Sequence, residues 1–261
     1  MELSLKGKVA LVCGSTQGIG KACAIELALL GASVILMARD GAKLRNVMPE
    51  LAASAGQKHD HIVADFTNVA DVKSASAEIS AKHLITILIN NTGGPPPGLA
   101  IEAAAEDFLK AFSQHLICNQ IITQALVPGM KKAGYGRIIN IISTSVKIPI
   151  RGLGVSNTVR SAVAGWAKTI SIELAPFGIT VNNVLPGSTQ TGRIESVIQS
   201  QALKSGRSEE DVRKAMIAEI PAGRMADAKE VAAVAAFLAT PAAGYVNGTS
   251  IPVDGGRTGS L

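Results

Sequence analysis

The segment SNTVR, residues 156–160, places a hydroxyl and a guanidinium four residues apart, on one face of an expected helix. An unassisted serine hydroxyl is far too weak an acid to act as a general acid near neutral pH. Arginine stays cationic at any relevant pH, so Arg160 can hold a ribose or a developing oxyanion but cannot easily recycle a proton. We therefore expect that Ser156 is not a proton donor and that Arg160 acts electrostatically.

A second group of residues has the spacing of a phosphate-binding turn. The segment GSTQGIGKACAIELALLG, residues 14–31, follows the apolar run KVALVC and has the composition of a helix. Glycines at such a strand-to-helix turn allow a tight bend and let backbone N–H groups approach a pyrophosphate at the helix N-terminus. The alternative is that these glycines only make the turn and a close helix–strand contact. The candidate residues are Gly14, Ser15, Thr16, Gln17, Gly18, Ile19 and Gly20.

The next apolar run ends in LMARD, residues 36–40, where the choice between two dinucleotides is usually made. A carboxylate at this point accepts from a ribose 2′-OH, whereas a nearby arginine suits a 2′-phosphate. Ala38 occupies the expected acidic position and Arg39 follows it, which favours NADP(H). In the alternative, Arg39 is solvated and Asp40 takes the ribose, but Asp40 precedes GAKLRNVM and has the character of a helix cap.

Short β-branched runs alternate with longer helical segments along the whole chain. This alternation predicts one α/β domain over residues 1–261, a doubly wound Rossmann-type fold with a seven-stranded parallel sheet. DAKEVAAVAAFLAT is an expected helix that opens at the capping residue Asp227. The expected strands are residues 8–13, 33–38, 61–64, 85–90, 137–143, 180–185 and 250–253.

Composition excludes several function classes. The formal net charge of +5 comes from scattered basic residues, which does not predict a nucleic-acid partner. The cysteines show neither metal-ligand spacing nor a disulfide framework, and the histidines show no third ligand nearby, so we expect no metal. The longest apolar run is too short for a membrane span and the N-terminus lacks a signal-like core, so we expect a cytoplasmic protein.

Further segments carry a resemblance over nearly the whole chain: ADFTN, NNTGG, GRIINIIS, LPGSTQT and YVNGTSIPVDGG. With the glycine turn, they resemble the short-chain dehydrogenase/reductase family and are similar to its β-ketoacyl-carrier-protein reductases. The resemblance implies that Asp65 and Phe66 border the adenine and that Asn91 and Gly93 lie along the cofactor. It also implies residues that flank the nicotinamide carboxamide: Pro186, Gly187, Thr189 and Thr191.

Catalysis in this family is attributed to an asparagine, a serine, a tyrosine and a lysine. The resemblance aligns these positions with His115, Ser143, Ser156 and Arg160, so only the serine is retained. Ser143 stands 13 residues before Ser156, as in the family, which supports the alignment. Because imidazole titrates near neutrality, His115 is a candidate to pass a proton toward Ser143, directly or through water. The alternative is a histidine hydrogen-bonded in the core or on a subunit-facing surface.

Residues 192–220 are rich in charge and in helix formers, and in the family this stretch is the mobile lid over the substrate. Its apolar residues Ile194, Val197 and Ile198 are expected either to line a pocket or to pack an amphipathic helix pair. The family also implies a homotetramer.

Two functions remain open from the sequence. The first is an NADP(H)-dependent oxidoreductase of a small carbonyl or alcohol, with 3-oxoacyl thioesters among the candidates and an atypical active site. The second is a catalytically impaired dinucleotide-binding protein that serves as a sensor or as a subunit of a hetero-oligomer. The retained Ser143 and the cofactor segments favour the first, and the three replaced positions favour the second.

Overall fold

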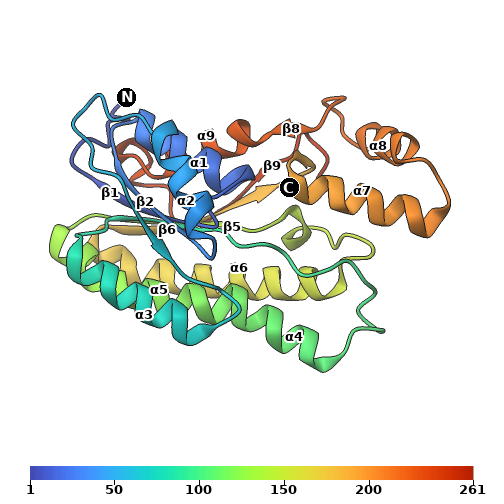
Figure 1. The fold of residues 1–261 in the computed structure, drawn as a ribbon, viewed down its shortest axis with the longest axis horizontal. Coiled ribbons are helices and arrows are strands. Elements are labelled where there is room, and N and C mark those ends of the chain that lie inside the picture. Colours follow the sequence, from blue (N-terminus) through green and yellow to red (C-terminus); the bar gives the residue numbers. More distant parts are fainter. Residues whose placement is uncertain (261) are drawn as a thin grey trace.

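A computed structural model describes residues 1–260 of the chain. Its centre is a seven-stranded sheet of order β3-β2-β1-β4-β5-β6-β9, and all neighbouring strands are parallel (Figure 1). The doubly wound sheet predicted from the sequence is therefore confirmed, with each strand at its expected place. The strands are β1 Val9–Cys13, β2 Ser33–Ala38, β3 Asp60–Val63, β4 Ile87–Asn90, β5 Gly136–Ile141, β6 Ile179–Pro186 and β9 Ser250–Val253.

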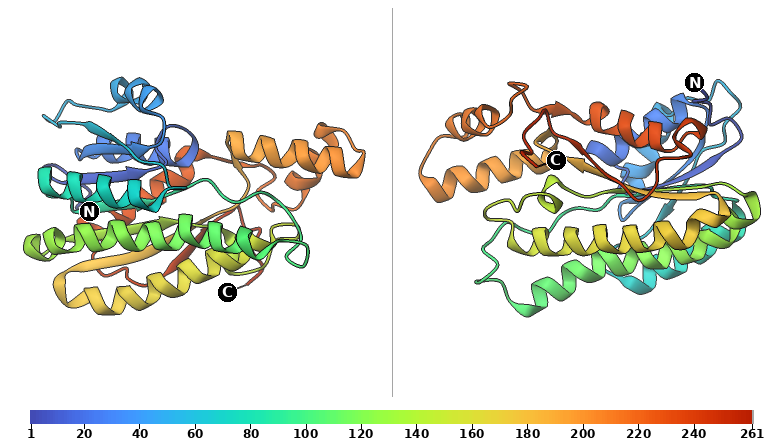
Figure 2. Two further views of the ribbon diagram at one scale, coloured as in Figure 1. Left: turned by 60° about the horizontal axis from the view of Figure 1, so that its bottom comes forward. Right: turned by 180° about the vertical axis from the view of Figure 1, so that it is seen from behind.

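Helices cover both faces of the sheet, so the central strands β1, β4 and β5 are buried on both sides. Helices α1, α2 and α9 lie on one face and α3, α4, α5 and α6 on the other (Figures 1 and 2). Two separate clusters of buried side chains fill the space between sheet and helices. The helices are α1 Gly18–Leu29, α2 Gly41–Val47, α3 Val69–Lys82, α4 Ala105–Phe112, α5 Cys118–Ala133, α6 Gly154–Leu174 and α9 Ala228–Leu238.

Helices α7 Gly192–Ser205 and α8 Glu209–Ala218 project from the main body (Figure 1). They have a small apolar cluster of their own, which includes Ile198 and Val212. The lobe joins the body through a two-stranded parallel pair, β7 Thr189–Gln190 and β8 Ala226–Asp227. No described helix is long and apolar enough to cross a membrane.

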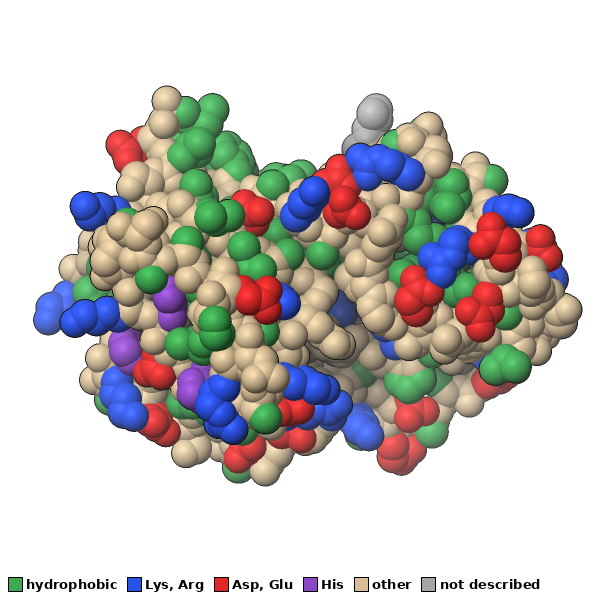
Figure 3. Space-filling view, turned by 45° about the horizontal axis from the view of Figure 1, so that its top comes forward, with side chains coloured by type: hydrophobic (Ala, Val, Ile, Leu, Met, Phe, Trp, Pro, Cys, Tyr) green, Lys and Arg blue, Asp and Glu red, His purple; other side chains and the backbone are tan. Residues whose placement is uncertain are grey.

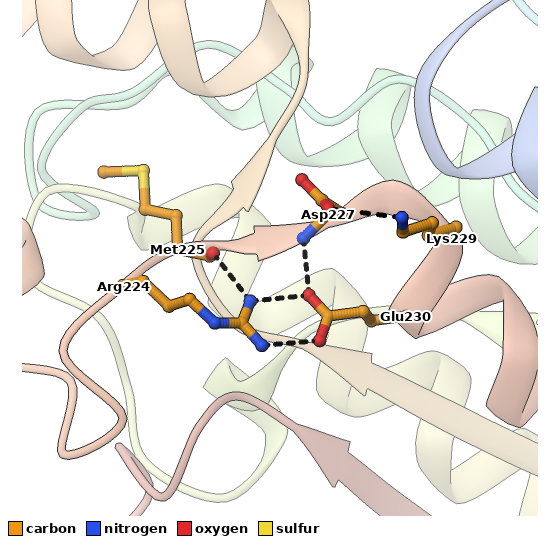
Figure 4. Close-up of polar contacts among 5 residues, drawn as sticks. All are labelled: Arg224, Met225, Asp227, Lys229 and Glu230. Atoms are coloured by element: carbon orange, nitrogen blue, oxygen red, sulfur yellow. Dashed lines mark hydrogen bonds and ion pairs between the residues drawn. The ribbon is translucent and has the colours of Figure 1, made fainter.

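The base of this lobe carries a tight ionic network (Figure 4). Both terminal nitrogens of Arg224 donate to the carboxylate of Glu230 at 2.7 Å. The same carboxylate accepts from the backbone N–H of Asp227 at 2.8 Å. Asp227 stands at the N-cap of α9, as predicted. The network therefore ties the end of the α7–α8 lobe to the start of a helix in the main body.

A ladder of buried amides crosses the carboxyl half of the sheet. The side-chain nitrogen of Asn90 donates to Asn140 at 2.9 Å, and that of Asn140 donates to Asn183 at 2.9 Å. Asn183 donates to the hydroxyl of Ser250 at 3.0 Å. The ladder links β4, β5, β6 and β9, and it fixes the register of the strands just before their site-bearing ends.

Candidate active site

A cavity of about 870 Å³ opens at the carboxyl ends of the strands, between the main body and the α7–α8 lobe. Figure 3 shows this face of the molecule hollowed beside the lobe. Ligands of doubly wound sheets bind at this edge. The cavity brings together thirteen of the predicted site residues: Gly14, Gln17, Gly18, Ile19, Asn91, Gly93, Ser143, Ser156, Arg160, Pro186, Gly187, Thr189 and Thr191.

The glycine turn forms one wall. Gly14 and Gly18 have φ values of +59° and +56°, in the left-handed region that favours glycine. A Cβ at Gly20 would lie 2.2 Å from the carbonyl oxygen of Gly14, so this glycine is required by helix–strand packing. The first turn of α1 has neither a side-chain cap nor an acidic residue. Its free N–H groups therefore fit a pyrophosphate. For Gly20, the alternative of a close helix–strand contact also holds.

Asn91 fastens this turn to the neighbouring strand. Its side-chain nitrogen donates to the carbonyl oxygens of Cys13 and Gly14 at 3.3 and 3.2 Å. A Cβ at Gly14 would lie 2.5 Å from the backbone oxygen of Asn91, so the two segments are in close contact. Asn91 thus shapes this wall of the cavity by holding the turn.

At the end of β2, the carboxylate next to Arg39 in the sequence is engaged as a helix cap. Asp40 caps α2, since its side chain accepts from the backbone N–H of Lys43 at 3.0 Å, as predicted. Arg39 is exposed. The backbone N–H of Thr67 and, more weakly, the charge of Arg39 lower the pKa of Asp65. Arg39 and Asp65 therefore lie near one another, outside the cavity lining.

Ser143, Ser156 and Arg160 converge on the opposite wall. Ser143 follows β5 and caps a short 3-10 turn, Thr144–Val146, by accepting from the N–H of Ser145 at 3.1 Å. Ser156 lies in the first turn of α6 and Arg160 one turn later. Arg160 is 8% exposed and donates to the carbonyl oxygen of Ile141 at 3.2 Å. Burial and the nearby Arg193 lower its pKa to about 10, so it is cationic at neutral pH.

The burial of His115 favours the second alternative from the sequence, a histidine hydrogen-bonded in the core. The residue is 2% exposed in a π-helical turn, Ser113–Ile117, between α4 and α5. Burial, together with the charge of Arg160, lowers its pKa to about 2. Its Nδ1 lies 2.5 Å from the hydroxyl of Thr92, and its Nε2 is buried without a partner in the described part of the chain. The imidazole is therefore neutral and a weak base.

Seven of the predicted catalytic and cofactor-binding residues lie outside the cavity lining. Phe66 packs on the cluster of buried residues under α3 and α5. In the lobe, Ile194 and Val197 line the cavity, whereas Ile198 packs inside the lobe, so both alternatives for this stretch hold for different residues. No group of three potential metal ligands occurs among residues 1–260. The predicted residues away from the lining are Ser15, Thr16, Gly20, Arg39, Asp65, Phe66 and His115.

Arg193 is a charged residue of the cavity lining that was not predicted from the sequence. Arg193, at the start of α7, donates to the carbonyl oxygen of Pro95 at 2.6 Å and so reaches across the cavity. Nothing in the local sequence marks it, because its neighbour in space is the proline-rich loop 95–97, far away in the chain.

The parallel sheet, the glycine turn and the cavity at the strand ends define a Rossmann-type α/β protein. Residues 14–258 match the family described as enoyl-(acyl carrier protein) reductase. The chain is 32% identical over 256 residues to a 3-oxoacyl-(acyl-carrier-protein) reductase of Pseudomonas aeruginosa, covering 97% of this chain and 98% of that protein. It is 30% identical to the NADPH-dependent reductase BacG of Bacillus subtilis, covering 97% and 99%. The chain belongs to the short-chain dehydrogenase/reductase family.

Solved structures of two reductases have the same fold as this chain. The actinorhodin polyketide ketoreductase with NADPH superposes with a TM-score of 0.90 at 32% identity, covering 97% of this chain and 98% of that one. The L-sorbose reductase of Gluconobacter frateurii, complexed with NADPH and L-sorbose, gives a TM-score of 0.92 at 28% identity, with both chains covered fully.

Proposed function

We propose that this protein is an NADP(H)-dependent oxidoreductase that interconverts a carbonyl compound and an alcohol, with Ser143 at an atypical active site. One observation carries the proposal: the glycine turn, Ser143 and Arg160 line the same cavity. The reductases cited above, which act with NADPH or on 3-oxoacyl groups, support the cofactor and the reaction class. 3-Oxoacyl thioesters are therefore among the substrates to test.

The chain's residues would hold the cofactor along the cavity. The N–H groups at the start of α1 would bind the pyrophosphate, Asn91 and Gly93 would lie along the dinucleotide, and the segment 186–191 would flank the carboxamide. Asp65 and Phe66 would border the adenine. When bound, NADPH would supply a hydride, that is one proton with two electrons, to the carbonyl carbon, and a proton from solvent would complete the alcohol.

The residues around the carbonyl would act by position and charge rather than by proton transfer. The hydroxyl of Ser143 would donate to the carbonyl oxygen, and Arg160 would stabilise negative charge that develops there or hold the ribose. Ser156 cannot donate a proton at neutral pH. His115 is neutral and buried, so its role would be to hold Thr92 rather than to titrate. Loss of general acid catalysis costs about 10² to 10⁴ in rate, which leaves a slow enzyme.

A pair of single substitutions tests these roles. NADPH oxidation would first be measured with a set of ketones, acyl-carrier thioesters and coenzyme A thioesters. For any substrate found, Ser143→Ala should lower kcat about 100-fold, because it removes a donor to the carbonyl oxygen. Ser156→Ala should retain most of the activity. The double variant Ser156→Tyr, Arg160→Lys should raise turnover if the tyrosine ring fits. Collapse with Ser156→Ala and tolerance of Ser143→Ala would reverse the assignment.

The second candidate is a dinucleotide-binding protein that has lost its chemistry, acting as a sensor or as a subunit of a hetero-oligomer. The combination of Ser156, a buried Arg160 and a non-titrating His115 favours it. Tight NADPH binding without turnover of any tested substrate, by the parent and by the double variant, would support this candidate over the first.

A further inference from the structure

The cavity has a surplus of positive charge. Besides Arg160 and Arg193 it is lined by Arg151, Lys204 and Arg257, and Glu219 is its only carboxylate among residues 1–260. That carboxylate forms an ion pair with Arg257. The charges deeper in the cavity are therefore not compensated by the protein.

Two of these arginines converge on one small space. A Cβ at Gly94 would lie 3.6 Å from the Nη2 atom of Arg160 and 3.6 Å from the Nη2 atom of Arg193. The two side chains come from different elements, α6 and α7, and meet only because the lobe folds over the sheet edge. We call Arg160 and Arg193 the arginine pair.

Neither member of the arginine pair has an ion-pair partner in the described chain. Each uses part of its donor set on a backbone carbonyl, Arg160 on Ile141 and Arg193 on Pro95. Buried charges in proteins are normally paired, and Arg160 is almost fully buried. Burial, and then the charge of Arg193, lower the pKa of Arg160, so an anion between the two would stabilise both cations.

The geometry points to a carboxylate-binding site: the arginine pair binds a carboxylate of the substrate, so the preferred substrate is an oxo acid or its hydroxy acid. This inference rests on the proposed oxidoreductase function. A guanidinium fork matches a planar carboxylate, and two of them can hold it from both sides. Arg160 donates to Ile141, two residues before Ser143, so the carboxylate would sit near the carbonyl that Ser143 contacts.

The cofactor phosphates are the other anions that could reach the cavity. The pyrophosphate has its own place at the uncapped start of α1, and the 2′-phosphate is expected at Arg39, outside the cavity lining. The ribose that Arg160 could hold instead is uncharged and would not compensate the two cations, so an anion of the substrate is the group that fits the arginine pair.

The test compares Arg193→Gln with Arg151→Gln, which removes the same charge from an exposed part of the cavity lining away from the pair. Both variants and the parent would be assayed on a series of 2-oxo and 3-oxo acids and on their methyl esters. We expect Arg193→Gln to lower kcat/KM for the acids about tenfold or more through KM, and to leave the esters and the Kd of NADPH unchanged. Arg151→Gln should alter the acids less than threefold.

Three results would overturn the inference. The first is an equal loss of kcat/KM for acids and esters in Arg193→Gln. The second is a loss in Arg151→Gln as large as that in Arg193→Gln. The third is a Kd for NADPH that rises as much as KM in Arg193→Gln, which would assign the pair to a cofactor phosphate. If the parent protein reduces none of these substrates, the proposed function is wrong. The carboxylate site is then tested on its own, by calorimetry of oxamate binding to the NADPH-loaded protein. Binding that weakens about tenfold in Arg193→Gln supports the carboxylate site, and no binding to the parent rejects it.

Discussion

Arg39 is a candidate to bind a phosphate, because the carboxylate of its neighbour Asp40 accepts a hydrogen bond at the N-cap of α2. We predict that NADPH binds at least about tenfold tighter than NADH, a difference of about 1.4 kcal/mol. Arg39→Gln should remove most of that preference by weakening NADPH alone. Fluorescence titration of both cofactors measures it, with Lys43→Gln as a nearby charge control. Equal or inverted affinities in the parent would contradict the assignment.

His115 gives a pH dependence whose sign follows from its burial. Its pKa falls from 6.5 to about 2 on folding, so the unfolded chain binds more protons between these values. The histidine therefore destabilises the protein as the pH falls below 6.5, by up to about 1.4 kcal/mol per pH unit. His115→Asn should flatten that part of the profile. Urea unfolding at neutral and mildly acidic pH measures it, and an unchanged slope would show that the imidazole is not held neutral.

The low pKa of His115 also bears on the pH dependence of the kinetics. Because its pKa is about 2 in the folded protein, the pH profile of kcat/KM should show no inflection near neutrality that disappears in His115→Asn. An inflection lost in that variant would restore His115 as the titrating group.

Among the elements, the amide ladder couples four strands that are far apart in sequence. Asn140 takes part in two of its hydrogen bonds, with Asn90 and with Asn183, whereas Asn90 takes part in one. We predict that Asn140→Ala lowers the free energy of unfolding by about 3 kcal/mol, because two buried polar partners lose their bonds. Asn90→Ala, a matched deletion, should cost about half as much. Chemical denaturation measures both, and equal losses would mean that the ladder does not couple the strands.

The lobe shows how an element can carry a site residue that its own sequence does not reveal. Helix α7 packs one face on α8, through Ile198, and turns another to the cavity, through Ile194 and Val197. Arg193 stands at its first turn. The periodicity of the helix predicted its existence but not which side meets the cavity, since that depends on the β7–β8 pair at its base.

At the scale of the whole molecule, two features suit assembly. The strand β9 forms an edge of the sheet. Apolar side chains are exposed on the outer helices, Leu109 of α4 at 69% and Ile172 of α6 at 67%. We predict a tetramer of 222 symmetry, built through α4, α5 and α6 and through the β9 edge. Light scattering should give a mass four times that of one chain, and Leu109→Asp should shift it to a smaller species. A monomeric parent would contradict the prediction.

The sequence by itself determined the strand segments, the glycine turn and the cap at Asp40, because each depends on neighbours close in the chain. The resemblance to a known family indicated Ser143, Ser156 and Arg160, and their spacing along the chain supported that alignment. Only the tertiary structure decided the state of His115, whose pKa is lowered by burial and by Arg160, and the meeting of Arg160 with Arg193. Burial and charge proximity arise when distant segments pack together, and residue order along the chain does not encode them directly.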